Sequence, residues 1–262
     1  MAARFLNVLF LASLAVAAPA VRRANTTAAV DQALPQVIKA NPRGNDAALI
    51  QSLLLAPTQK ERINLLNQPG DTIFDFTNPP AGATSTGKGG NLVSANAESF
   101  PALIGNGAAM SVAFLGPCGL NSPHVHNRAT ELNIPVKGRL VTSFFEENGV
   151  TARQDLLNTY SMAVFPQGAI HSEYNPDCED AVFVAGFNNP DPGVEQVAQA
   201  FFNLRSDIIQ ASLDGVSMLN GEDIDSFKDI LPANIVQGVE TCLAKCGISK
   251  KAKRDLAEVL SA

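Results

Sequence analysis

Residues 123–131 read PHVHNRATE, so His124 and His126 are separated by one residue and Glu131 follows five positions later. Alternate residues of a β-strand project from the same face, and a strand here would therefore aim both imidazoles into one cavity. We expect Glu131 to begin the next strand after a short turn, which would bring its carboxylate to the same point. His171 ends the stretch FPQGAIH at 165–171, which predicts a tight turn leading into another strand.

These two stretches contain all three histidines of the chain. Neutral imidazoles and one carboxylate form a mixed nitrogen and oxygen ligand set, which suits manganese, iron, nickel, copper or zinc. The spacing does not choose among these metals. The alternative is that the histidines are ordinary surface or core residues and that Glu131 is solvated. We favour a metal site made of His124, His126, Glu131 and His171, because no histidine lies outside the two motifs.

Short apolar runs separated by turn residues surround both motifs. They span 108–115, 131–136, 139–145, 150–155, 161–165 and 181–187. This spacing is typical of a β-sandwich or barrel. Asn148 and Gly149 predict a tight hairpin turn, because both tolerate a positive φ. We also expect a short strand over Ile73–Phe76 and a loop over the Gly-, Ser- and Thr-rich segment 81–90.

Helical periodicity appears on both sides of the predicted barrel. Leu49, Ile50, Leu53 and Leu54 recur at helical spacing, and Pro57 and Thr58 begin another short helix. After residue 189 the apolar residues again follow a helical period, at positions 194, 197, 198, 201, 208, 209, 227, 230, 235, 239 and 243. The expected organisation is a helical N-terminal extension over 21–70, a barrel over 71–189 and a helical C-terminal region over 190–262.

The first 20 residues have the pattern of a secretory signal peptide: Arg4, an apolar run over 5–18 and a small-residue triplet ending at Ala20. The run is too short to span a bilayer comfortably, and no later segment is long enough, so we expect an exported chain without a membrane anchor. Arg22 and Arg23 either mark a second processing cut, which would make 21–23 a propeptide, or only flank the signal. Asn25 begins a usable glycosylation sequon.

The composition indicates one sizeable hydrophobic core. Of the 262 residues 46% are hydrophobic and 17% charged, and the formal net charge is −6. A basic nucleic-acid footprint is absent. Four cysteines in an exported chain suggest two disulfides, for which the sequence alone permits three pairings, and reduced thiols remain an alternative. They are Cys118, Cys178, Cys242 and Cys246.

Both histidine stretches resemble the two motifs of cupins, in particular of germins and spherulins. The first motif is matched by Gly119, His124, His126, Glu131 and Gly138, and the second by Pro166, Gly168, His171 and Asn175. Cys118 and Tyr160 stand where these motifs usually have glycine. The resemblance covers roughly 73–187, and the flanking residues 100–103 and 175–178 look more like secreted spherulin-type proteins than plant germins.

This resemblance implies an all-β jelly-roll barrel in which His124, His126, Glu131 and His171 bind a metal, with manganese first. Gly138 and Gly168 would have turn roles and Asn175 a structural one. The strands bearing His124 and His171 would be antiparallel neighbours, and from this we predict a Cys118–Cys178 disulfide. Cys242 and Cys246, four apart on an expected helix, have poor geometry for a mutual disulfide.

The resemblance also implies an extracellular metal-dependent oxidoreductase, acting on superoxide or on a small dicarboxylate such as oxalate. Asn121 matches an asparagine that oxalate-oxidising germins direct at the substrate, although it could instead cap a turn. Ser111 stands where those enzymes have a second asparagine. Tyr174 would lie at the pocket rim or pack within the barrel.

Two other functions remain open at this point. One is a non-catalytic wall, spore or stress protein, like the spherulins, that keeps the metal for stability. The other is a cupin that binds a small ligand. Germin-like relatives are oligomeric, so the resemblance and the apolar C-terminal helices together predict a homo-oligomer.

Overall fold

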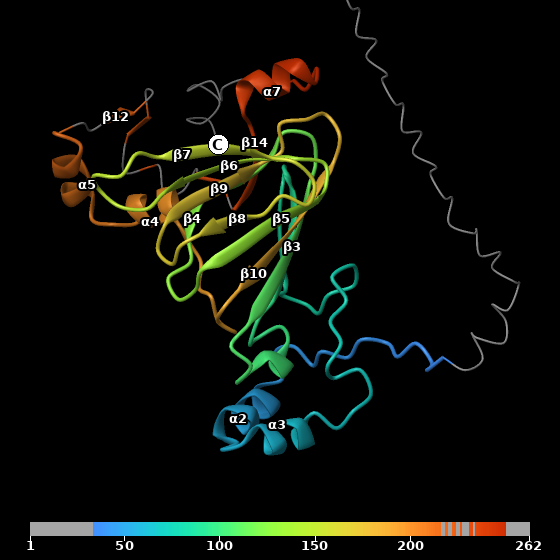
Figure 1. Ribbon diagram of the computed structural model, residues 1–262. Helices are drawn as coiled ribbons and strands as arrows, with labels where there is room; N and C mark the ends of the chain where they lie inside the picture. Colours follow the sequence, from blue (N-terminus) through green and yellow to red (C-terminus); the bar gives the residue numbers. More distant parts are fainter. Residues whose placement is uncertain are drawn as a thin grey trace, which may run out of the picture. The chain divides into compact units, whose positions relative to one another are not determined.

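The computed structural model describes residues 34–215, 218–219, 222–223, 226, 231–232 and 234–249 (Figure 1). The expected signal peptide, the sequon at Asn25 and the expected helical positions 227 and 230 lie outside the described residues. The chain divides into two compact units, 1–37 and 38–262, and every described helix and strand belongs to the second. Within the described residues, no helix is both long and apolar enough to cross a membrane.

Two antiparallel sheets form the body of the molecule (Figure 1). The first has the order β1 (Thr84–Gly87), β2 (Gly90–Ala95), β3 (Ala109–Leu115), β10 (Ala181–Phe187), β5 (Glu131–Lys137) and β8 (Ala163–Phe165). The second has the order β11 (Glu195–Gln196), β4 (Gly119–Val125), β9 (Ile170–Tyr174), β6 (Leu140–Phe145) and β7 (Arg153–Leu157), and β14 (Ile235–Gln237) also pairs with β4. The predicted all-β fold is confirmed, although the sheets do not close into a continuous barrel.

The core lies between the sheets, where alternate residues of the strands point inward. On β3 and β10 the inward positions include Ala113, Leu115 and Phe183, each at most 1% exposed. Leu140 of β6 and Ile235 of β14 pack against them from the second sheet. This alternation is the two-residue period that the apolar runs show in the sequence, and it leaves the opposite face of each strand for solvent.

Two predictions about local strand structure were wrong. Residues 73–76 form no strand, and the expected loop over 81–90 contains β1. Four polar or glycine residues build β1, so its position does not depend on apolar side chains. A Cβ added at Gly87 or at Gly89 would collide with the backbone of β14. Close backbone approach therefore positions this edge of the sheet, and hydrophobic patterning does not reveal it.

The β6–β7 hairpin is present, with Leu140 opposite Leu157 and Phe144 opposite Arg153. The connection spans 146–152 and is longer than the predicted tight turn. Gly149 has a φ of +94° within it. Two turn positions without glycine also take a left-handed conformation: Cys118, with a φ of +59°, and Tyr160, with a φ of +67°. These are the two positions where the sequence departs from the glycines of the motifs that it resembles.

The predicted N-terminal helices are present as α2 (Ala47–Leu55) and α3 (Gln59–Leu65), capped by Asp46 and Thr58. The short helix η1 (Pro101–Leu103) precedes Ile104, which packs against α2. In its described part, the C-terminal region is less helical than predicted. Its helices are α4 (Val197–Phe202), α5 (Ser206–Ser212) and α7 (Glu240–Lys245), but Ile235, predicted to be helical, lies in β14, and β12 (Met218–Leu219) pairs with β13 (Glu222–Asp223).

The disulfides join Cys118 to Cys242 and Cys178 to Cys246, so the predicted Cys118–Cys178 bond is wrong. The segments that carry Cys118 and Cys178 do lie next to each other, as expected, because the Cys118 amide donates to the carbonyl of Asp177 at 3.3 Å. Helix α7 covers this neighbourhood and presents there both Cys242 and its C-cap residue Cys246, as their spacing of four residues allows. Cys118, just before β4, and Cys178, in the loop after β9, are therefore bonded to Cys242 and Cys246, and the two disulfides fasten the C-terminal segment to the sheets.

Candidate metal centre

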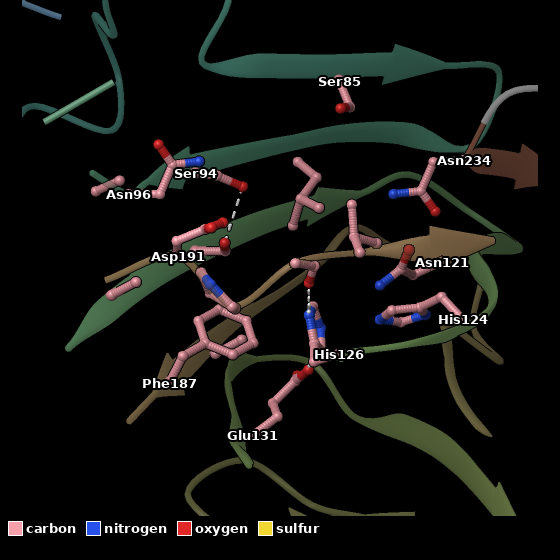
Figure 2. A pocket seen from close by; sticks show the side chains of 18 of the residues that line it. Ser85, Ser94, Asn96, Asn121, His124, His126, Glu131, Phe187, Asp191 and Asn234 are labelled. Atoms are coloured by element: carbon pink, nitrogen blue, oxygen red, sulfur yellow. Dashed lines mark hydrogen bonds and ion pairs between the residues drawn. The ribbon is translucent and has the colours of Figure 1, made fainter. Parts of the chain in front are cut away.

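Three strands bring the four predicted ligand residues together. His124 lies on β4 and His171 faces it on β9, in a direct register pair. His126 follows the end of β4, and Glu131 is the first residue of β5 in the other sheet. One ligand atom from each of the four residues lies within 4.8 Å of those of the other three. Figure 2 shows His124, His126 and Glu131 at one wall of a cavity.

Backbone carbonyls orient all three imidazoles. The Nδ1 atoms of His124 and His171 lie 2.9 and 2.8 Å from the carbonyl oxygens of Ser122 and Ala169, and Nδ1 of His126 bonds the Gly193 carbonyl. A carbonyl only accepts hydrogen bonds, so each Nδ1 carries the proton and donates it. A neutral imidazole then presents its lone pair at Nε2, which is the tautomer that metal-binding histidines use.

Glu131 lies at the centre of the group and is 2% exposed. Its Oε2 is 3.0 Å from Nε2 of His126 and 3.0 Å from Nε2 of His171, while Nδ2 of Asn133 donates to its Oε1 at 3.0 Å. Burial alone would raise the pKa of Glu131, but the hydrogen bonds that Nε2 of His126 and of His171 donate when protonated hold it well below its ordinary value. The carboxylate is therefore ionised at neutral pH.

The pKa values of His124 and His171 shift in opposite directions. Burial, with the neighbouring His171, lowers the pKa of His124 to about 3. Burial also opposes charge on His171, yet its hydrogen bond to Glu131 raises the pKa of that imidazole to about 9. The buried carboxylate thus requires one positive charge nearby, which a proton on His171 or a metal cation can supply. Three convergent nitrogen donors and one ionised oxygen donor fit a divalent transition metal.

Two phenylalanines brace the histidines on their apolar sides. The ring of Phe165 stacks on His171 with centroids 4.5 Å apart and an interplanar angle of 18°. Phe187 contacts His126 at 4.6 Å between centroids. These contacts, with the hydrogen bonds at Nδ1, fix the ring orientations, so the donor atoms are already arranged before any ligand arrives.

A cavity of about 330 Å³ opens beside the four residues and is lined by both sheets and by the segment 191–194. Asn121, predicted as a substrate contact, lines this cavity, and its side chain does not cap a turn. Its Nδ2 donates to Oε2 of Glu173 at 2.8 Å. Ser111 also lines the cavity, and its hydroxyl lies 2.9 Å from that of Ser94. Tyr174 does not line the cavity but packs beside Cys118 and Cys242.

Glu173 is a buried acid that the sequence analysis missed. It follows His171 by two residues on β9 and so shares its face, a signal that was available in the sequence. It is fully buried, and its Oε1 lies 4.0 Å from Nε2 of His171 and has no hydrogen-bond partner among the described residues. Burial, reinforced by the charge of Glu131, raises the pKa of Glu173 to about 8.

The chain is similar to one known protein family and to several individual proteins. Residues 75–221 match the cupin family model. Spherulin-1B of Physarum polycephalum is 40% identical over 84% of this chain and 88% of its own length. A putative germin-like protein 2-2 of Oryza sativa subsp. japonica is 34% identical over 49% of this chain and 58% of its own.

Among solved structures, oxalate oxidase in complex with the substrate analogue glycolate superposes with a TM-score of 0.51. The match has 24% sequence identity and covers 61% of this chain and 82% of that one. At this identity the likeness concerns the fold alone.

Proposed function

This chain belongs to the cupin family, with spherulins and germin-like proteins among its relatives, and from that premise we propose that it is a secreted protein that binds manganese. The proposed ligands are His124, His126, Glu131 and His171. The observation that carries the proposal is the convergence of three Nε2 atoms, each oriented by a backbone carbonyl at Nδ1, on one buried carboxylate. Iron, nickel, copper and zinc are the alternatives for the same ligand set.

The proposed activity is that of an extracellular oxidoreductase acting on superoxide or on a small acid such as oxalate. A bound metal would supply redox and Lewis-acid chemistry. The protein would supply the partly open cavity lined by His124, His126 and Glu131, which suits a molecule of few heavy atoms. The fold that this chain shares with oxalate oxidase is compatible with the proposal.

Secretion and self-association are further parts of the proposal. Two disulfides favour an oxidising compartment, in keeping with the expected signal peptide over residues 1–20. Met110, Leu132 and Val164 lie on outward faces of the first sheet and are 44%, 45% and 51% exposed. Exposed apolar side chains on a sheet favour contact with a second copy. Light scattering of the purified protein should give a mass above that of one chain.

A non-catalytic role like that of a spherulin-type wall, spore or stress protein is the second candidate. The extent of the similarity favours it, since Spherulin-1B is matched over 88% of its length and the germin-like protein over 58%. In this role the metal would tie β4 and β9 of one sheet to β5 of the other and so stabilise the fold.

Two assays on metal-loaded protein separate these candidates: peroxide production from oxalate, and removal of superoxide. The oxidoreductase proposal predicts turnover in at least one assay, and predicts that Glu131→Gln abolishes it. Glu147→Gln, in the exposed β6–β7 connection, removes the same charge far from the ligands and should leave turnover unchanged. Inactivity in both assays, with the metal present, would contradict the oxidoreductase and favour the structural role.

A further inference from the structure

Most polar groups in the cavity already have partners within the protein. Arg128 is the one arginine or lysine among the described lining residues, and its guanidinium donates to the side chain and carbonyl of Asp191 at 2.7 and 2.9 Å. The Asn121 amide nitrogen is bonded to Glu173, and the Ser94 and Ser111 hydroxyls are bonded to each other. An acid entering this cavity therefore meets few uncommitted donors.

The amide nitrogen of Asn234 differs from these committed donors. It lines the same cavity, and Figure 2 shows its side chain directed into the cavity near Asn121 and His124, with the amide nitrogen on the cavity side. Its Oδ1, like that of Asn121, is buried and has no hydrogen-bond partner among the described residues. Its Nδ2 donates no hydrogen bond to another described residue, and this nitrogen is the atom of the amide that can bond a carboxylate oxygen.

The backbone around Asn234 is held firmly in place. The Ser122 amide donates to the Asn234 carbonyl at 3.3 Å, and the next residue, Ile235, pairs with Asn121 across β14 and β4. Gln237 donates through Nε2 to the carbonyl of Pro117 at 2.9 Å, and shortly afterwards Cys242 is bonded to Cys118. The position of the Asn234 amide therefore follows from strand pairing and a covalent link.

We propose that Asn234 is a specificity-determining residue, whose amide donates a hydrogen bond to a carboxylate oxygen of a small organic acid held beside the four metal ligands. The inference rests on the proposed function, because it takes the acid to bind next to the metal. Asn234 lies beyond residues 75–221, which match the family model. The C-terminal strand thus adds to the cavity a ligand contact that the two histidine motifs do not contain.

The test is the affinity of metal-loaded protein for oxalate, measured by titration calorimetry, with metal content measured in parallel. Asn234→Ala should weaken oxalate binding about tenfold, as expected for one lost hydrogen bond to a charged group. Asn234→Asp has nearly the same shape but replaces the donor with an acceptor, and it should weaken binding further. Asn91→Ala, at an exposed position of β2, is the matched control and should bind oxalate like the unmodified protein.

The outcomes separate this inference from the proposal that it rests on. Unchanged oxalate affinity in both Asn234 variants, at normal metal content, would overturn the role of Asn234 and leave the metal site standing. A loss of metal from Asn234→Ala would show a structural role and overturn the inference as well. An unmodified protein that holds no metal would contradict the proposed function, and the inference would fail with it.

Discussion

The paired strands β4 and β9 carry a cluster of chemically reactive side chains at each end. At one end His124 lies opposite His171, and at the other the Cys118 amide bonds the carbonyl of Asp177. The histidine cluster is completed by Glu131, seven residues from His124 in the sequence, whereas the cysteine cluster is completed from α7 by Cys242, which lies 124 residues beyond Cys118. The first cluster depends on local strand geometry, and the second on where a distant segment docks.

This difference predicts that a mutation in one cluster leaves the other cluster intact. Removing a disulfide should have the largest effect on stability. Replacing Cys118 and Cys242 together by serine should lower the free energy of unfolding by about 2–5 kcal/mol, because the unfolded chain loses a long-range constraint. Urea unfolding followed by circular dichroism would measure it. Metal content should stay unchanged, since no cysteine is among the four proposed ligands. A parallel loss of metal would show that the clusters are coupled.

The cysteine end also has an ionic link that should matter less. Hydrogen bonds from Arg139 hold the pKa of Asp177 at about 2, with a further contribution from Lys245 of α7. The folded pKa lies below the ordinary value, so the stabilisation is fully present above about pH 4 and is lost as the pH falls toward 2. Because the pair is partly exposed, Asp177→Asn should cost at most about 1 kcal/mol at pH 6.

Unfolding of the variant and of the unmodified protein at several pH values checks this prediction. The difference between them should shrink as the pH falls from 4 to 2. Asp155→Asn, on the exposed face of β7, is the control and should show no such convergence. A difference that stays constant with pH would contradict the ionic origin of the effect.

The smallest expected effect concerns Cys118 and Tyr160, the two left-handed residues that stand at glycine positions of the motifs. At Cys118 the strain of a positive φ is offset by the disulfide to Cys242. Tyr160 is 75% exposed, so little packing offsets the same strain there. Tyr160→Gly should therefore raise the free energy of unfolding by about 0.5 kcal/mol, since glycine relieves the strain but adds entropy to the unfolded chain. Gly138→Ala, at a φ of +70°, should have the opposite sign in the same unfolding assay. Destabilisation by Tyr160→Gly would contradict this explanation.

The same contrast explains why the ligand cluster could be predicted from the sequence and the cysteine pairing could not. The proximity of the proposed ligands follows from the two-residue alternation that continues from β4 to His126 and from the pairing of β4 with β9, and both are visible in the motifs. The pairing of the cysteines required the position of α7. The strand β14 could not be predicted because Ile235 and Val239 also fit a helical period, and only the docked backbone beside Gly87 and Gly89 distinguishes the two. Asn234, which this strand positions, was missed for the same reason.

Elemental analysis of the natively purified protein tests the central claim most directly. The proposed site predicts one transition-metal ion per chain, chiefly manganese, in the unmodified protein and in Glu147→Gln. Glu131→Gln removes the buried charge that requires a cation, and its metal content should fall below about a tenth of that value. A folded protein that carries no stoichiometric metal, or a Glu131→Gln variant that retains it in full, would contradict the metal site.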